Sequence, residues 1–80
     1  MTANHHRVLA MLHELHLAAD RRPILADRIL RGLRRTQGRG TQRTVAIALR
    51  GLERDGLVDR AGRGYRPTAK GRRRILELDR

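Results

Sequence analysis

Residues 41–71 constrain the fold of this chain most, because a helix signal and a hairpin signal follow one another there. Thr41 is a residue type that caps helices through its hydroxyl, and it directly precedes residues 42–54. Within that segment, aliphatic residues recur at three- and four-residue spacing, which is typical of an amphipathic helix with one buried stripe. The stripe consists of Val45, Ala48, Leu49 and Leu52. The segment is therefore predicted to be a capped helix that lies on a core.

A hairpin is predicted directly after this helix, over residues 57–67. Gly56 suits the left-handed position that closes a helix, and a Gly-Arg-Gly tip separates two short runs that can pair as antiparallel strands. Tyr65 is expected to pack its ring beneath these strands rather than to contact a ligand. Thr68 then caps a last helix, predicted over residues 69–79.

Two more helices are predicted in the first half of the chain. Apolar residues at helical spacing indicate a helix over residues 5–19, with Asn4 as its capping residue. A second helix is expected over residues 23–34, because Pro23 suits the first position of a helix. The pattern fits one domain spanning residues 1–80, mainly α with a small two-stranded β wing. This order of elements is that of a winged helix-turn-helix.

The charge of the chain points to a polyanionic partner. Nineteen Lys and Arg residues oppose eight Asp and Glu residues, so the formal net charge is +11. A field of that size attracts nucleic acid, and the Arg guanidinium binds phosphate or guanine in bidentate fashion. The chain has a single Tyr and neither Phe nor Trp, so it lacks the aromatic platform on which unstacked bases lie. Double-stranded DNA is therefore the expected partner.

The predicted helix over residues 42–54 leaves its second face free to meet bases. Arg43 and Arg50 are expected to pair with guanine, and Ile47 to contact a thymine methyl group. Gln42 is expected to contact adenine or a phosphate. Taken singly, each of these residues is also typical of a solvated surface, and an exposed Ile47 would suit a subunit contact as well.

A second group of residues is expected to hold the DNA backbone. Its members precede or open the same helix, or belong to the hairpin: Arg39, Thr41, Thr44, Arg60, Arg63 and Arg66. The arginines of the second helix are expected to contribute further phosphate contacts.

Two strings of the chain, LRGLERDGLVDR and GYRPTAKGRRRI, resemble the winged helix-turn-helix regulators of the MarR and PadR kind. The residues that carry the resemblance are Leu52, Glu53, Gly56, Leu57, Val58, Tyr65, Thr68 and Gly71. The likeness is close over residues 40–75, and it implies a sequence-specific DNA-binding protein. The implied role is that of a small, repressor-like transcriptional regulator that acts by occupying an operator.

A regulator of this kind is expected to form a homodimer, because two-fold protein symmetry normally mirrors a palindromic operator. The first helix is favoured for the contact, since Leu9, Met11 and Leu17 add apolar area beyond its core stripe. The last helix, with Leu76 and Leu78, is the second choice. A monomer that binds DNA through charge alone is the alternative.

Other classes of function are disfavoured by the composition. The chain has no Ser or Cys nucleophile and its acids are scattered, so neither an enzyme nor a cofactor is expected. Its histidines are interpreted as surface residues rather than metal ligands; they are His5, His6, His13 and His16. No apolar run approaches the roughly 20 residues of a membrane span, so a cytoplasmic protein without a membrane partner is expected.

Two alternatives to a regulator stay open. The same fold can serve as a protein–protein interaction module, with the charge providing solubility or a loose nucleic-acid contact. It can also serve as a phage or plasmid architectural factor of the excisionase kind, which would bend DNA rather than only occupy it.

Overall fold

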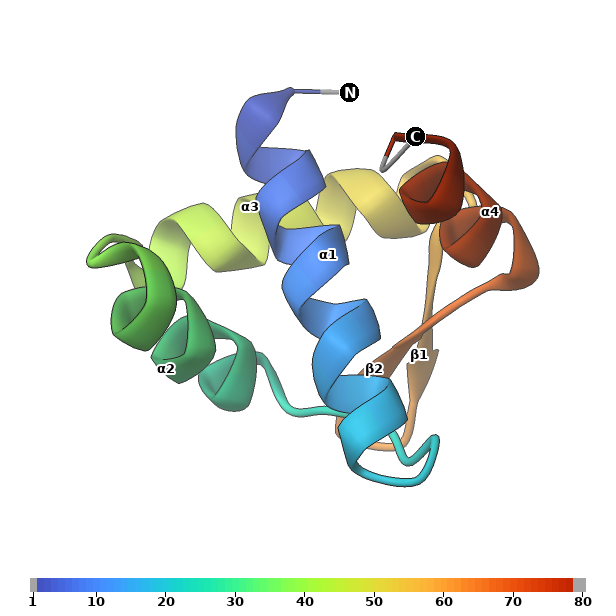
Figure 1. Ribbon diagram of the computed structural model, residues 1–80, viewed down its shortest axis with the longest axis horizontal. Coiled ribbons are helices and arrows are strands. Elements are labelled where there is room, and N and C mark those ends of the chain that lie inside the picture. The colour runs from blue at the N-terminus through green and yellow to red at the C-terminus, as the bar shows by residue number, and fades with distance from the viewer. Residues whose placement is uncertain (1, 79–80) are drawn as a thin grey trace.

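The computed structural model describes residues 2–78, which form four helices and one antiparallel hairpin (Figure 1). In chain order the elements are α1 (Ala3–Ala18), α2 (Ala26–Gln37), α3 (Gln42–Arg54), β1 (Val58–Ala61), β2 (Gly64–Pro67) and α4 (Ala69–Leu78). The predicted class, mainly helical with a small two-stranded sheet, is confirmed.

The bounds predicted for α3 are confirmed, because its ends are set by local chemistry. The Thr41 hydroxyl accepts a hydrogen bond from the Thr44 N–H at 3.1 Å, and the Thr44 hydroxyl accepts one from the Thr41 N–H at 3.0 Å. This reciprocal capping box satisfies two donors at the start of the helix. After Asp55 the chain leaves the helix through Gly56, whose φ of +75° is a conformation that other residues adopt only with strain.

The cap predicted for the first helix is wrong, since α1 begins at Ala3 and Thr2 is its capping residue. The Thr2 hydroxyl accepts a hydrogen bond from the His5 N–H at 3.2 Å. The Asn4 side chain instead reaches across to α3 and donates to the Thr44 carbonyl at 3.2 Å. Asn4 therefore ties two helices together rather than ending one.

The start predicted for the second helix is also wrong, because residues 23–25 are extended. Ile24 exchanges two backbone hydrogen bonds with Tyr65, each 2.8 Å long, so this segment forms a bridge to β2. α2 begins only after Leu25 and runs to Gln37, where Gly38 closes it at a φ of +65°. A tertiary pairing has overridden the local helix signal of the proline.

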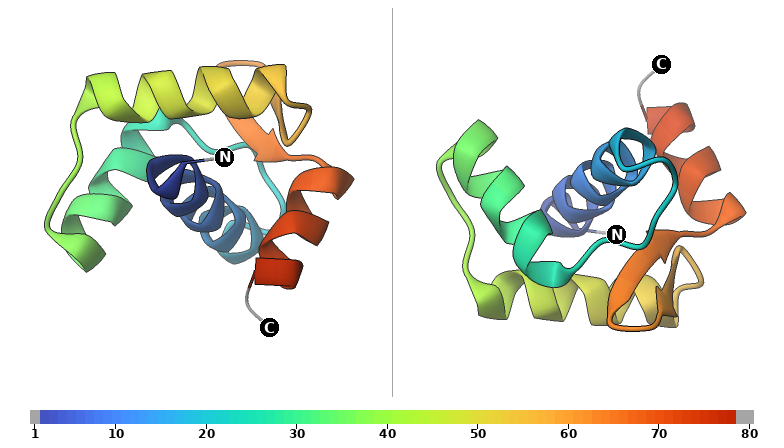
Figure 2. Two further views of the ribbon diagram at one scale, coloured as in Figure 1. Left: turned by 90° about the horizontal axis from the view of Figure 1, so that it is seen from above. Right: turned by 90° about the horizontal axis from the view of Figure 1, so that it is seen from below.

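The core is aliphatic, and α1 lies at its centre. α1 contacts α2, α3, α4 and β2, and Figure 2 shows it between α2 and α4. α3 and the hairpin lie together along one edge of the molecule in both views of that figure. The largest fully buried aliphatic side chains come from α1, α2, α3 and β1; they are Leu9, Leu12, Ile29, Leu49, Leu52, Val8, Val45 and Val58.

The central place of α1 corrects two predictions about its side chains. Leu9 and Met11 were expected to add apolar area to a dimer surface, but they are 0% and 6% exposed. The Met11 sulfur lies so close to Gly32 of α2 that a methyl group there would meet it at 2.6 Å. His16 was expected at the surface and is 5% exposed, with its Nδ1 atom 2.9 Å from the Arg22 carbonyl oxygen.

α4 is held against the hairpin by its capping residue and by a close approach of backbones. The Thr68 hydroxyl accepts from the Gly71 N–H at 3.0 Å and donates to the Gly56 carbonyl at 2.7 Å. A Cβ atom at Gly71 would overlap the Leu57 carbonyl oxygen. This position therefore requires a glycine for packing rather than for its backbone angle.

No helix within residues 2–78 is long and apolar enough to cross a membrane.

Candidate nucleic-acid interface

The outer face of α3 carries the residues predicted to contact bases. The predicted stripe is buried, together with Gly51, which lies against His5 of α1, and Gln42, Arg43, Ile47 and Arg50 are all exposed. Ile47 stands out because it is 57% exposed between two arginines.

One further cation extends this face and was missed from the sequence. Residues 43, 47, 50 and 54 are four, three and four positions apart, so on a helix they form one continuous stripe. We call Arg43, Ile47, Arg50 and Arg54 the outer stripe of α3. Helical spacing alone would have identified Arg54, which follows Arg50 by one turn.

Gln42 lies to one side of the outer stripe rather than on it. It lines a cleft of about 230 Å³ between α2 and α3, together with Ala26, Asp27, Leu30, Val45 and Ala46. The side chain is therefore placed at the border between the two helices, beside the outer stripe.

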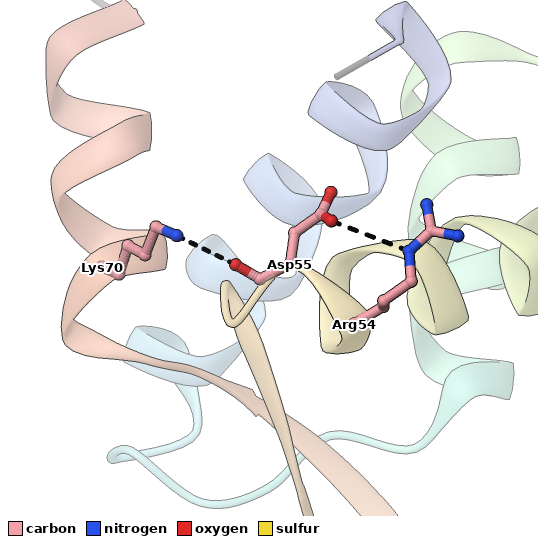
Figure 3. Close-up of polar contacts among 3 residues, drawn as sticks. All are labelled: Arg54, Asp55 and Lys70. Carbon is pink, nitrogen blue, oxygen red and sulfur yellow. Dashed lines mark hydrogen bonds and ion pairs between the residues drawn. The ribbon is translucent and has the colours of Figure 1, made fainter.

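At the C-terminal end of α3, Asp55 holds two cations in place (Figure 3). The Asp55 carboxylate lies 3.7 Å from the Arg54 Nε atom, and its backbone carbonyl accepts a hydrogen bond from the Lys70 ammonium at 3.0 Å. Lys70 thus pairs with the negative end of the helix dipole. Both the Arg54 and the Asp55 side chains are well exposed, so the ion pair leaves Arg54 free to exchange partners.

Around the first turn of α3, some polar groups are hydrogen-bonded within the protein and others have no partner among the described residues. The Thr41 and Thr44 hydroxyls lie 3.2 Å apart and are engaged in the capping box, so their first role is structural. Arg39 is exposed and has no hydrogen bond or ion pair within residues 2–78. The N–H groups of Gln42 and Arg43 also have no partner within that range, as is usual for a helix start.

The three hairpin arginines are in different situations. Arg63 is exposed at the tip, beside Gly62 and Gly64. Arg60 pairs across the hairpin with Tyr65, lies 5.6 Å from its ring centroid, and approaches Glu53 of α3 at 3.7 Å. Arg60 is thus partly engaged within the protein.

Arg66 is exposed and pairs across the hairpin with Asp59. Successive pairs of an antiparallel ladder point to opposite faces, so Arg66 and Arg60 do not share a face. Tyr65 is partly buried against the core, as its predicted packing role requires.

Three of the four arginines of α2 lie beside α1. Arg28, Arg31 and Arg35 line a cleft with Leu15 of α1, and Arg31 is paired with Asp27 at 3.1 Å. A fourth, Arg34, donates through Nε to the Gly40 carbonyl at 3.2 Å and so braces the loop before α3. The structure does not bring the first three to the outer stripe of α3.

The histidines of α1 do not form a metal site in the part of the chain that the structure describes. No group of three or more His, Cys, Asp or Glu side chains within residues 2–78 is placed to hold a metal ion. His16 is used instead to fix the chain after α1. Because a carbonyl oxygen can only accept, the His16 Nδ1 atom must carry the proton that is donated to Arg22.

Comparison of the chain with protein-family models, with curated proteins and with solved structures gives no match. The function must therefore be argued from the surface of the molecule itself.

Proposed function

We propose that this protein binds double-stranded DNA as a winged helix-turn-helix, with α3 as the helix that enters the major groove. The observation that carries the proposal is the outer stripe of α3, in which three arginines flank an exposed isoleucine. A helix is about 10–12 Å across with its side chains, and the major groove is about 12 Å wide. An arginine-rich, exposed helix face at the edge of a molecule has the shape and the charge to fit such a groove.

Each residue of the stripe has a separate role in the proposed complex. Arg43 and Arg50 donate to the N7 and O6 atoms of guanine, and Ile47 packs on a thymine methyl group. Gln42 approaches the DNA from the α2 side and contacts adenine or a phosphate. Arg54 lies on the last turn of α3, where a contact to the backbone is expected, because the N-terminal part of a recognition helix contacts the bases.

The hairpin would serve as the wing, with Arg63 as its phosphate contact. The bridge between Ile24 and Tyr65 adds a third extended segment beside β2 and so limits movement of the hairpin relative to α3. Arg66 and Arg39 are further candidates for phosphate contacts, since both are exposed. Arg60 is expected to contribute less to phosphate binding, because its guanidinium group already contacts Glu53 and Tyr65.

The biological role we propose is that of a small transcriptional regulator of the MarR and PadR kind, which represses by occupying its operator. We propose that it acts as a homodimer on a palindromic site. With Leu9 and Met11 buried, the apolar area available for the contact is that of α4, where Leu76 is 58% exposed, and the end of α1, where Leu17 is 50% exposed.

Selection of bound duplexes from a random pool, followed by binding measurements at several salt concentrations, tests the proposal. A palindromic consensus is expected. Arg50→Ala should then cost about 1–3 kcal/mol on the selected site and relax the preference at one base pair. Arg63→Ala should weaken binding to selected and scrambled duplexes alike and reduce the salt dependence.

Arg35→Ala on α2 is the matched control, because this exposed arginine lines the cleft beside α1 and belongs to neither the outer stripe of α3 nor the hairpin. Equal losses from Arg50→Ala and Arg63→Ala on every duplex would contradict the division between base and phosphate contacts. If no preferred sequence is selected, the proposed regulatory function is contradicted, and the protein binds DNA without sequence specificity.

A further inference from the structure

A cleft of about 230 Å³ lies where α1, α2 and α3 meet at the N-terminal end of α3. It is formed by the start of α1, the end of α2, the loop between α2 and α3, and the first turn of α3; its lining residues are Asn4, Arg7, Leu33, Gln37, Arg39, Gly40, Thr41 and Thr44. One water occupies roughly 30 Å³ in the liquid. The cleft therefore has room for a polar group larger than a single water.

The charge lining this cleft is entirely positive. Arg7 and Arg39 contribute guanidinium groups, and no Asp or Glu belongs to the lining. Neither arginine makes a hydrogen bond or an ion pair within residues 2–78, although Arg7 is partly buried. A partly buried cation without a counterion favours binding of an anion from solution.

Three of the other polar side chains of the cleft, those of Asn4, Thr41 and Thr44, are held by contacts within the protein. The Asn4 amide is bonded to the Thr44 carbonyl, and the Thr41 and Thr44 hydroxyls are bonded to one another. The Asn4 bond holds the start of α1, which carries Arg7, against the start of α3. This part of the cleft is therefore in place before a ligand binds.

The cleft lies on the Thr44 side of α3, next to the outer stripe. Thr44 follows Arg43 by one residue, which is a rotation of about 100° on a helix. A helix that fills a major groove of about 12 Å has a DNA backbone strand on either side of it. The cleft is thus beside the outer stripe, where a phosphate of the groove wall would lie.

From these observations we infer that this cleft binds a phosphate group, with the Arg7 guanidinium as the main ligand and Arg39 as the second. Where the phosphate belongs to DNA, the inference rests on the proposed function. The same chemistry would bind free phosphate, and the experiments below separate the two sources. Arg7 lies far from α3 in the sequence, so only the packing of α1 on α3 places it there.

The first experiment measures the salt dependence of DNA binding by fluorescence anisotropy. Each phosphate contact contributes about 0.9 to the slope of log affinity against log salt concentration. Because the two arginines share one phosphate, Arg7→Gln and Arg39→Gln should each lower the slope, and the double variant should lower it by about 0.9 in total. Arg35→Gln, on the α1 side of α2, should leave it unchanged. Thermal unfolding followed by circular dichroism confirms that each variant is folded.

The second experiment titrates inorganic phosphate into the free protein and follows nitrogen–proton NMR signals. Shifts are expected at the Arg7 side-chain Nε–H and at the backbone amides of residues 39–43, and they should be absent in Arg7→Gln. If Arg7→Gln does not fold, Arg7→Lys replaces it in the phosphate titration, and Arg39→Gln alone tests the salt dependence. Arg7→Lys keeps the charge but loses the bidentate fork, so it should show weakened shifts.

The two measurements distinguish failure of the phosphate site from failure of the proposed DNA binding. A reduced slope supports a DNA phosphate, and shifts without a change of slope support free phosphate. An unchanged slope together with no shifts overturns the inference, even if the wild-type protein binds DNA through α3. If the wild-type protein binds no duplex, the proposed function fails, and the phosphate titration alone then decides whether the cleft binds phosphate.

Discussion

α1 and α3 are neighbouring helices that pack on one another, yet α1 is enclosed by other elements and α3 leaves one face in solvent. α1 contacts four other elements and buries four aliphatic side chains and one histidine. α3 lies at an edge of the molecule, buries a single stripe and leaves its arginines in solvent (Figure 2). α1 therefore organises the fold, whereas α3 has one face free to bind a partner.

The strongest test of this contrast shortens one aliphatic side chain on each helix. Leu12 of α1 is 0% exposed, and Ile47 of α3 is 57% exposed. Leu12→Ala should lower the free energy of unfolding by about 2–5 kcal/mol, because it leaves a cavity in the core. Ile47→Ala should change it by less than about 0.5 kcal/mol. Urea unfolding followed by circular dichroism measures both, and similar losses would remove the distinction.

A second test concerns the buried histidine of α1. His16→Ala removes a packed ring and the donor to the Arg22 carbonyl, and should cost about 1–3 kcal/mol of unfolding free energy. His16→Asn is the matched control, because its amide N–H can take the place of the ring donor. Asn should restore about 1 kcal/mol of the loss in the same urea experiment. If the two variants have equal free energies of unfolding, the packing of the ring rather than its hydrogen bond stabilises the protein at this position.

The third test concerns the far end of the outer stripe of α3. Arg54→Ala should leave stability within about 0.5 kcal/mol of wild type, since its ion pair with Asp55 is exposed. DNA affinity should fall by a similar factor on all duplexes, with a slope of log affinity against log salt smaller by about 0.9. Anisotropy on selected and scrambled duplexes measures this. A loss confined to the selected sequence would instead make Arg54 a base contact.

The smallest effect on DNA affinity is expected where α3 meets the hairpin. Arg60→Ala removes a distant ion pair with Glu53 and a cation–π contact with Tyr65, and should cost about 0.5–1 kcal/mol of stability. Its effect on DNA affinity should be weaker than that of Arg63→Ala, which removes an unpaired cation. A larger effect on DNA than that of Arg63→Ala would mean that Arg60 leaves its protein partners in the complex.

The parts of the fold that were predictable depend on neighbours in the sequence. The Thr41 and Thr68 caps, the glycine after α3 and the aliphatic stripe of α3 were all expected, because each rests on contacts within a few residues. The start of α2 was not, since Pro23 and Ile24 are extended by pairing with a hairpin far along the chain. The outward placement of Ile47 and Arg50 could likewise be derived from helical spacing alone.

The sequence alone determined the order of helices and hairpin, the face of α3 that is buried and the excess of positive charge, because spacing and composition carry that information directly. Only the tertiary structure decided which helix is enclosed and which arginines are left free. Leu9 and Met11 are buried because other elements surround α1, and Arg28, Arg31 and Arg35 are turned away from α3 by the packing of α2 on α1. Arg7 and Arg39 share a cleft for the same reason: contacts between segments distant in sequence bring them together.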